Sequence, residues 1–179
     1  MNDRTLAIVS NPLGRPISST AVLYMVDEAP CETTLTVVLF DATLAEQLVA
    51  QNYVPDDALL GAMRIETDKR SSEPCTPSLV VARKGYGPLL YDLAARILSK
   101  HDKRCTGLQP ATARSDHAKD FWARIGHDQI APLSDNMLMA KYGMGPKALE
   151  ASGRRFRKRT GVGGDKALER AATRLYVMH

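Results

Sequence analysis

Hydrophobic and polar positions follow two different periods along this chain. In the first third, short apolar runs predict strands at Thr20 to Val26, Thr33 to Phe40 and Leu59 to Ile65, and β-branched residues dominate the second of these runs. Asp41 is placed to cap a helix over residues 42–51, whose leucines share one face. The polar run over residues 66–76 predicts an exposed loop.

The centre of the chain has the pattern of a strand, a glycine turn and a helix. Leu79, Val80 and Val81 form the apolar run, and Gly85 and Gly87 interrupt it. Pro88 then stands where a first helical turn begins, a position at which its missing N–H costs nothing. Apolar residues recur at helical spacing over 89–98, while the polar face carries Asp92, Arg96 and Lys100.

A second amphipathic helix is predicted over residues 115–126, with Ser115 as its N-cap and Gly126 as its stop. Further strands are expected at 105–108 and at either 130–133 or 137–140. Strands come first as a run and then alternate with helices. This order predicts an α/β fold with a mixed α+β sheet and ligand binding at the glycine turn.

The glycine turn has the composition of an anion site. A helix start offers unpaired N–H groups and the positive end of a dipole, and glycines let an anion approach the backbone. Arg83 and Lys84 add two positive charges, which suit a pyrophosphate. The alternative is a plain strand-to-helix connection in which the glycines only make the turn tight.

Two stretches together resemble a known family. Arg83 to Gly87 is similar to the Q/R-x-x-G-x-G/A pyrophosphate loop of the GCN5-related N-acetyltransferases (GNAT), and Ala118 to Gly126 is similar to their later Ala-x-x-Phe-Tyr-x-x-x-Gly helix. The segments Lys84 to Asp92, Ser115 to Trp122 and Ile130 to Asp135 resemble a group of small GNAT-like proteins of tailed bacteriophages. The resemblance covers roughly residues 58–140.

The resemblance implies a GNAT-like acyl-CoA-binding fold and an acyl-CoA-dependent N-acyltransferase whose acceptor is unknown. It also implies that the strand before Gly85 splays from its neighbour and that the pantetheine of acetyl-CoA, the co-substrate, lies in the opening. The residues expected at the cofactor are Val80, Val81, Arg83, Lys84, Gly85, Tyr86, Gly87 and Ser115. Ser115 is equally explained by its capping role, and Tyr86 by packing.

The chemistry needs a base for the amine and an acid for the leaving thiolate. The family often uses a tyrosine as the acid, but Trp122 stands at that position, and an indole cannot serve at neutral pH. We expect Trp122 to be a core anchor. The candidate bases are Glu66, Asp116 and His117, each with a structural alternative: a solvated strand end, a first-turn acid and an inert exposed histidine.

Charge separates residues 1–142 from a basic, glycine-interrupted helical extension over residues 143–179, and the resemblance implies that residues 1–142 form a GNAT-like domain. From residue 141 onward ten Lys and Arg stand against three Asp and Glu, while the whole chain has a net charge of +4. A basic cluster in the extension is suited to DNA phosphates or to an acidic partner, or it only aids solubility. The cluster consists of Arg154, Arg155, Arg157, Lys158 and Arg159.

Other classes of function find little support in the sequence. No apolar run is long enough to span a membrane and no signal peptide is visible, so we expect a cytoplasmic protein, in a host cell or a virion if phage-encoded. Three cysteines lie far apart, which predicts reduced thiols, and the four histidines have no metal-ligand spacing. The alternative to an enzyme is a catalytically silent GNAT-like phage virion or assembly protein whose basic tail contacts DNA or neighbouring subunits.

Overall fold

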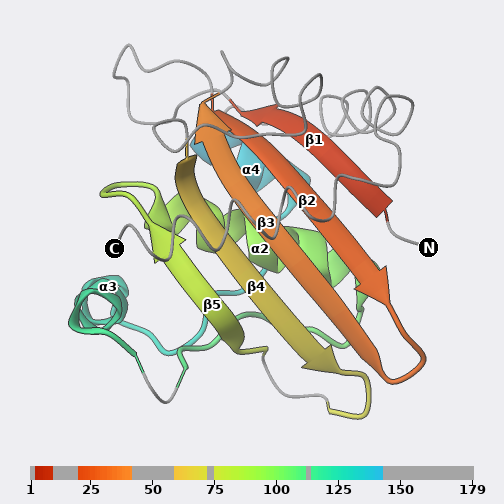
Figure 1. The fold of residues 1–179 in the computed structure, drawn as a ribbon. Coiled ribbons are helices and arrows are strands. Elements are labelled where there is room, and N and C mark those ends of the chain that lie inside the picture. Colours follow the sequence, from red (N-terminus) through yellow and green to blue (C-terminus); the bar gives the residue numbers. More distant parts are fainter. Residues whose placement is uncertain (1–2, 10–19, 42–58, 72–74, 112–113, 143–179) are drawn as a thin grey trace.

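A computed structural model describes residues 3–9, 20–41, 59–71, 75–111 and 114–142 of the chain. Its centre is a five-stranded antiparallel sheet in the order β1-β2-β3-β4-β5, so each strand pairs with its neighbours in sequence (Figure 1). The strands are β1 (Asp3–Val9), β2 (Thr20–Glu28), β3 (Glu32–Asp41), β4 (Leu59–Asp68) and β5 (Pro77–Ala82). The three strands predicted in the first third of the sequence are therefore confirmed, and β4 continues into the stretch predicted to be a loop.

Three helices follow the sheet: α2 (Gly87–His101), α3 (Asp116–Ile125) and α4 (Asp135–Tyr142). Figure 1 shows α2 and α4 behind the sheet and α3 beside its β5 edge. The described part of the chain thus has the predicted mixture of α and β structure. The named strands are all antiparallel. Of the two alternatives for the last strand, Met137 to Ala140 is wrong, because this segment belongs to helix α4, whereas Ile130 forms a β-bridge with Leu108.

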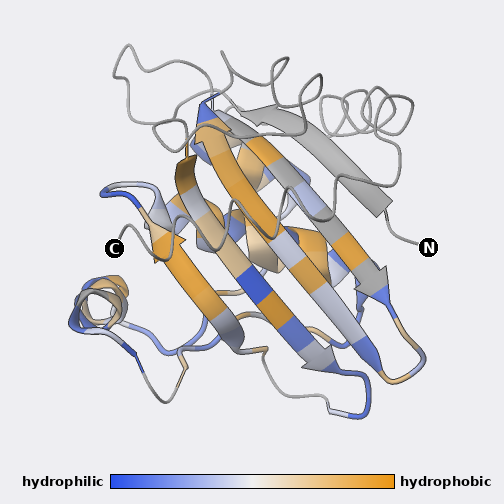
Figure 2. Cartoon of the chain, viewed as in Figure 1, coloured by the Kyte–Doolittle hydropathy of each residue, from blue (hydrophilic) through white to orange (hydrophobic). Residues whose placement is uncertain are grey.

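The main core lies between α2 and one face of the sheet. Strand residues at alternate positions, among them Leu35, Val37, Met63 and Ile65, face α2 and are fully buried. Figure 2 shows the corresponding apolar stretches on the strands. Burying one such side chain stabilises the fold by roughly 2 kcal/mol, so the sheet and α2 hold each other in place. The buried residues of α2 are Leu89, Leu90, Tyr91, Asp92, Leu93, Ala94, Ala95, Ile97 and Leu98.

Helix α4 is fastened to α2 at both of its ends by charged groups. At its start, Asp135 Oδ1 lies 2.8 Å from Arg96 Nη2, and these contacts lower the pKa of Asp135 although its burial acts in the opposite direction. At its end, Tyr142 donates a hydrogen bond to the carboxylate of Asp92. An eight-residue helix is too short to be stable alone, so these contacts and buried Leu138 fix it.

The segments after α2 pair only at isolated positions. Leu108 forms a parallel bridge with Cys75 and an antiparallel bridge with Ile130, where strands were predicted at 105–108 and 130–133. The predicted helix over residues 42–51 and the extension over residues 143–179 lie outside the described residues. None of the described helices is long and apolar enough to cross a membrane.

Candidate functional site

The glycine turn joins the end of β5 to the start of α2, as predicted. Arg83 extends the pairing of β5 with β4, because its backbone N–H donates to the Leu60 carbonyl at 2.8 Å. Gly85 has φ +93°, a conformation that only glycine adopts without strain, and a Cβ added to it would meet no atom of the described residues within 4 Å, apart from its chain neighbours. Within the described part of the chain, the turn is therefore open on this side.

The start of α2 has backbone donors that precede the hydrogen-bond ladder of the helix. The first N–H group of the helix with an acceptor is that of Leu90, which donates to the Tyr86 carbonyl at 3.0 Å. The N–H groups of Gly87 and Leu89 precede this ladder, and Pro88 has none. Tyr86 is the N-cap residue, yet its side chain makes no capping bond. The turn thus combines helix N–H groups with the positive end of the α2 dipole.

The two basic residues of the turn differ in their surroundings. Lys84 is exposed. Arg83 is partly buried, and its Nε donates to the Leu59 carbonyl at 2.6 Å. Lys84 is therefore the better placed of the two to meet an anion in solvent, while Arg83 also holds the turn against β4.

Helix α3 lies against the turn through an aromatic cluster. Phe121 stacks on Tyr91 with the ring centroids 4.9 Å apart, and Trp122 meets both rings edge-on. A Cβ on Gly87 would lie 3.8 Å from Phe121, an ordinary van der Waals contact. Trp122 is 5% exposed, which confirms its prediction as a core anchor.

Strand β5 is the last strand of the described sheet, and its two edges differ. One edge pairs with β4. On the other side the chain pairs at Cys75, whose N–H donates to Gly107 and whose carbonyl accepts from Gln109, each at 2.9 Å. Among the described residues this pairing ends before β5 begins, so the strand itself has β4 as its one partner.

Of the three candidate bases, Glu66 lies away from the turn, and Asp116 and His117 lie at the start of α3. Glu66 is exposed, pairs with Arg64 at 3.0 Å, and lies at the far end of β4, about 16 Å along the strand from Gly61. Gly61 is the β4 residue opposite Ala82 and thus marks the end near the turn. Asp116 is in the first turn of α3, with its side chain 94% exposed and 2.9 Å from Lys119. The backbone of His117 follows it in the same turn.

Ser115 caps α3, as the sequence predicts. Its hydroxyl accepts a hydrogen bond from the Ala118 N–H at 3.3 Å, and Gly126 ends the helix with φ +71°. The capping role accounts for Ser115 without a ligand. Val80 and Val81 are half-buried in β5, whereas the five basic residues at 154–159 lie outside the described residues.

Sequence reasoning missed a second site at the opposite end of β5. There the Sγ atoms of Cys75 and Cys105 lie 3.3 Å apart, beside buried Asp102 and a cleft of about 210 Å³. The cysteines are thirty positions apart and have no Cys-x-x-Cys spacing. A strand was expected at 105–108, but its pairing with Cys75 was not predicted, because residues 66–76 were expected to form an exposed loop.

Neither a metal site nor a known relative identifies the function of this chain. Within the described ranges, no cluster of three or more His, Cys, Asp or Glu side chains could hold a metal ion. No family model, no curated protein and no solved structure matches the chain.

Proposed function

We propose that this chain is a GNAT-like protein that binds acyl-CoA at the turn between β5 and α2 and uses it for N-acyl transfer. The backbone from Val81 to Gly87 would hold the pyrophosphate and the start of the pantetheine. The observation that carries the proposal is the glycine turn with its helix donors, next to a strand edge that opens on one side.

The shape of the turn supports pyrophosphate binding. The open space over Gly85 admits a bulky anion, and Lys84 adds a positive charge that solvent reaches. The side of β5 that has no partner among the described residues would offer backbone groups to the amides of a pantetheine arm. Acyl-CoA would supply the activated acyl group, and the chain's part in the reaction would be to position it.

The same surroundings favour a second candidate function, a protein that binds acyl-CoA without transferring the acyl group. Trp122 occupies the place of the family's acid and is buried. Tyr91, the phenol one helical turn after Gly87, is 5% exposed; burial raises its pKa, against smaller opposing effects of Trp122 and Arg114. A catalytically silent phage virion or assembly protein would need no acid at this position.

Calorimetric titration with acetyl-CoA and with CoA at low salt tests the proposal. We expect saturable micromolar binding to the wild type and its loss in Gly85→Val, because valine cannot keep φ near +93°. Gly126→Val is the matched control, since this glycine also has positive φ and open space around its Cβ position, but lies at the end of α3. If Gly85→Val bound acetyl-CoA as tightly as Gly126→Val and the wild type, the turn would not be part of the binding site.

Two charge-reversal variants test the contact between the turn and the pyrophosphate. Lys84→Glu should weaken CoA binding at least tenfold, while Lys103→Glu, an equal charge change beyond the other end of α2, should leave it unchanged. Transfer is then assayed by release of free CoA thiol with a panel of amines. Binding without release for any amine would favour a protein that binds acyl-CoA without transfer, and failure of a folded sample to bind would refute both functions proposed for the turn.

A further inference from the structure

Two thiols meet where the chain enters β5. The Cys75 thiol is placed to donate a hydrogen bond to Cys105 Sγ at 3.3 Å. Backbone bonds hold this arrangement, because Cys75 is paired with Gly107 and Gln109 on the segment that carries Cys105. A disulfide has an S–S length of about 2.05 Å, so the two sulfur atoms need to approach by only about 1.3 Å to form one.

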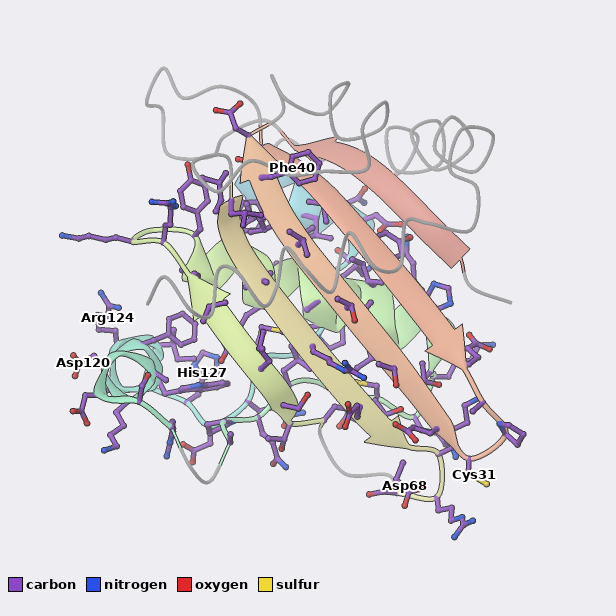
Figure 3. All side chains as sticks on the ribbon, viewed as in Figure 1. Cys31, Phe40, Asp68, Asp120, Arg124 and His127 are labelled. Atoms are coloured by element: carbon purple, nitrogen blue, oxygen red, sulfur yellow. The ribbon has the colours of Figure 1, made fainter. Side chains whose placement is uncertain are left out.

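Solvent reaches the pair through the cleft, which both cysteines line. Cys75 is partly exposed and Cys105 is 5% exposed. The cleft is a separate site from the glycine turn, because the six residues of β5, about 20 Å of extended chain, lie between them. Asp68, which is labelled in Figure 3, lies at the end of β4 and lines this cleft.

We propose that Cys75 and Cys105 form a thiol–disulfide exchange site that reacts with low-molecular-weight disulfides. The Cys105 thiolate attacks one sulfur of the reagent, the reagent's S–S bond breaks, and one thiolate leaves. Cys75 then loses its proton to the second leaving group and attacks Cys105 Sγ, which expels that group as a thiol. The protein gains one internal disulfide and the reagent is reduced to two thiols, so the electrons balance.

The order of attack follows from the hydrogen bond. Donation from the Cys75 thiol lowers the pKa of Cys105 to about 7, against the opposing effects of burial and Asp102. The thiolate on Cys105 in turn raises the pKa of Cys75, so the pair carries one negative charge near neutral pH. Cys105 is therefore the nucleophile and Cys75 the resolving thiol.

The charge of the cleft sets its preferred reagent. Among the described residues, its lining includes the carboxylates of Glu66, Asp68 and Asp102 and the cationic side chain of Arg104. Arg104 pairs with Asp102 and Arg64 pairs with Glu66, so Asp68 and the Cys105 thiolate give the cleft its remaining negative charge. This excess of negative charge attracts cationic disulfides and repels anionic ones. We therefore expect cystamine, which carries two ammonium groups, to react faster than neutral hydroxyethyl disulfide, and both faster than dianionic dithiodipropionate.

The test uses the full chain with Cys31→Ser, because Cys31 is an exposed thiol at the turn between β2 and β3 (Figure 3). Each of the three disulfides is added to the reduced protein, and intact mass is followed with time. We expect a product lighter by two hydrogen atoms, with cystamine at least tenfold faster than dithiodipropionate. Peptide mapping should place the new bond between Cys75 and Cys105.

Single variants in the same background test the order of attack. Cys75→Ser keeps a hydroxyl donor for Cys105 and should stop at the mixed disulfide on Cys105, whereas Cys105→Ser should react at least tenfold more slowly. Mixed disulfides that never resolve in the protein with both thiols would overturn the proposal. Equal rates for the two single variants would overturn the assignment of Cys105 as nucleophile, and equal rates for the three reagents would overturn the charge selection.

Discussion

Tyr142 donates a hydrogen bond to the carboxylate of Asp92 inside the protein, where the two side chains join the end of α4 to the middle of α2. Lys141 adds a second donor, with its Nζ 2.6 Å from the same Asp92 oxygen. Burial and the neighbouring carboxylate raise the pKa of Tyr142, so its phenol stays protonated and remains a donor. A buried carboxylate is thus satisfied by residues fifty positions later in the chain.

Tyr142→Phe should therefore destabilise the protein by roughly 1–3 kcal/mol, because it leaves the buried Asp92 oxygen without its phenol donor. Urea unfolding of the wild type, Tyr142→Phe, Asp92→Asn and the double variant measures the loss as a double-mutant cycle. Strong coupling between the two changes is expected. Additive effects would mean that the hydrogen bond contributes nothing and that the ring alone matters.

Local signals in the sequence predicted much of this fold. Ser115 and Gly126 marked the ends of α3 because capping depends on the residues at the helix ends themselves. Gly85 and Pro88 marked the turn into α2 for the same reason. The apolar runs located β2, β3 and β4, since each strand carries its own pattern.

What sequence reasoning missed depends on contacts between distant segments. Asp92 was placed on the polar face of its helix, but α4 covers it and supplies its partners. Met137 to Ala140 was one of two strand expectations, yet the segment is a helix held by Asp135 and Tyr142. No spacing rule relates Cys75 to Cys105, because only the bridge at Leu108 brings them together.

Stability should fall in acid partly through Asp102. Its burial opposes the charged form, but hydrogen bonds from Arg104 and Thr67 outweigh this effect and lower the pKa of Asp102 below its usual value. A carboxylate with a lowered pKa in the folded state stabilises the protein above its unfolded pKa, near 4, and this contribution is lost as pH falls further. We expect Asp102→Asn to show a smaller loss of stability between about pH 5 and pH 2 than the wild type.

Asp120→Asn is the control for that measurement, because Asp120 is an exposed carboxylate on α3 (Figure 3) and the charge change is the same. Unfolding free energies are compared across the pH range for the three proteins. A profile for Asp102→Asn parallel to that of the wild type would show that other carboxylates cause the acid sensitivity.

Gly107 should tolerate alanine less well than Gly85 does. A Cβ on Gly107 would lie 2.6 Å from the Ile130 carbonyl oxygen and 2.8 Å from Gln129 Nε2, whereas a Cβ on Gly85 meets nothing within 4 Å. Both glycines have positive φ, so both changes add backbone strain of roughly 1 kcal/mol, and Gly107→Ala adds a clash of roughly 1–3 kcal/mol. Thermal unfolding compares the variants, and equal destabilisation would show that the Ile130 segment moves away without cost.

The disulfide between Cys75 and Cys105 should stabilise the fold once it forms. It would close a loop of about thirty residues that contains the glycine turn and α2, and loops of this length gain roughly 3 kcal/mol from the reduced freedom of the unfolded chain. Denaturant unfolding of the oxidised and reduced proteins in the Cys31→Ser background measures the gain. The matched control is Cys75→Ser, whose stability should be the same with and without oxidant. If oxidation instead destabilised the protein, the disulfide would strain the native positions of the two cysteines. Its formation would then require the backbone hydrogen bonds of Cys75 with Gly107 and Gln109 to break.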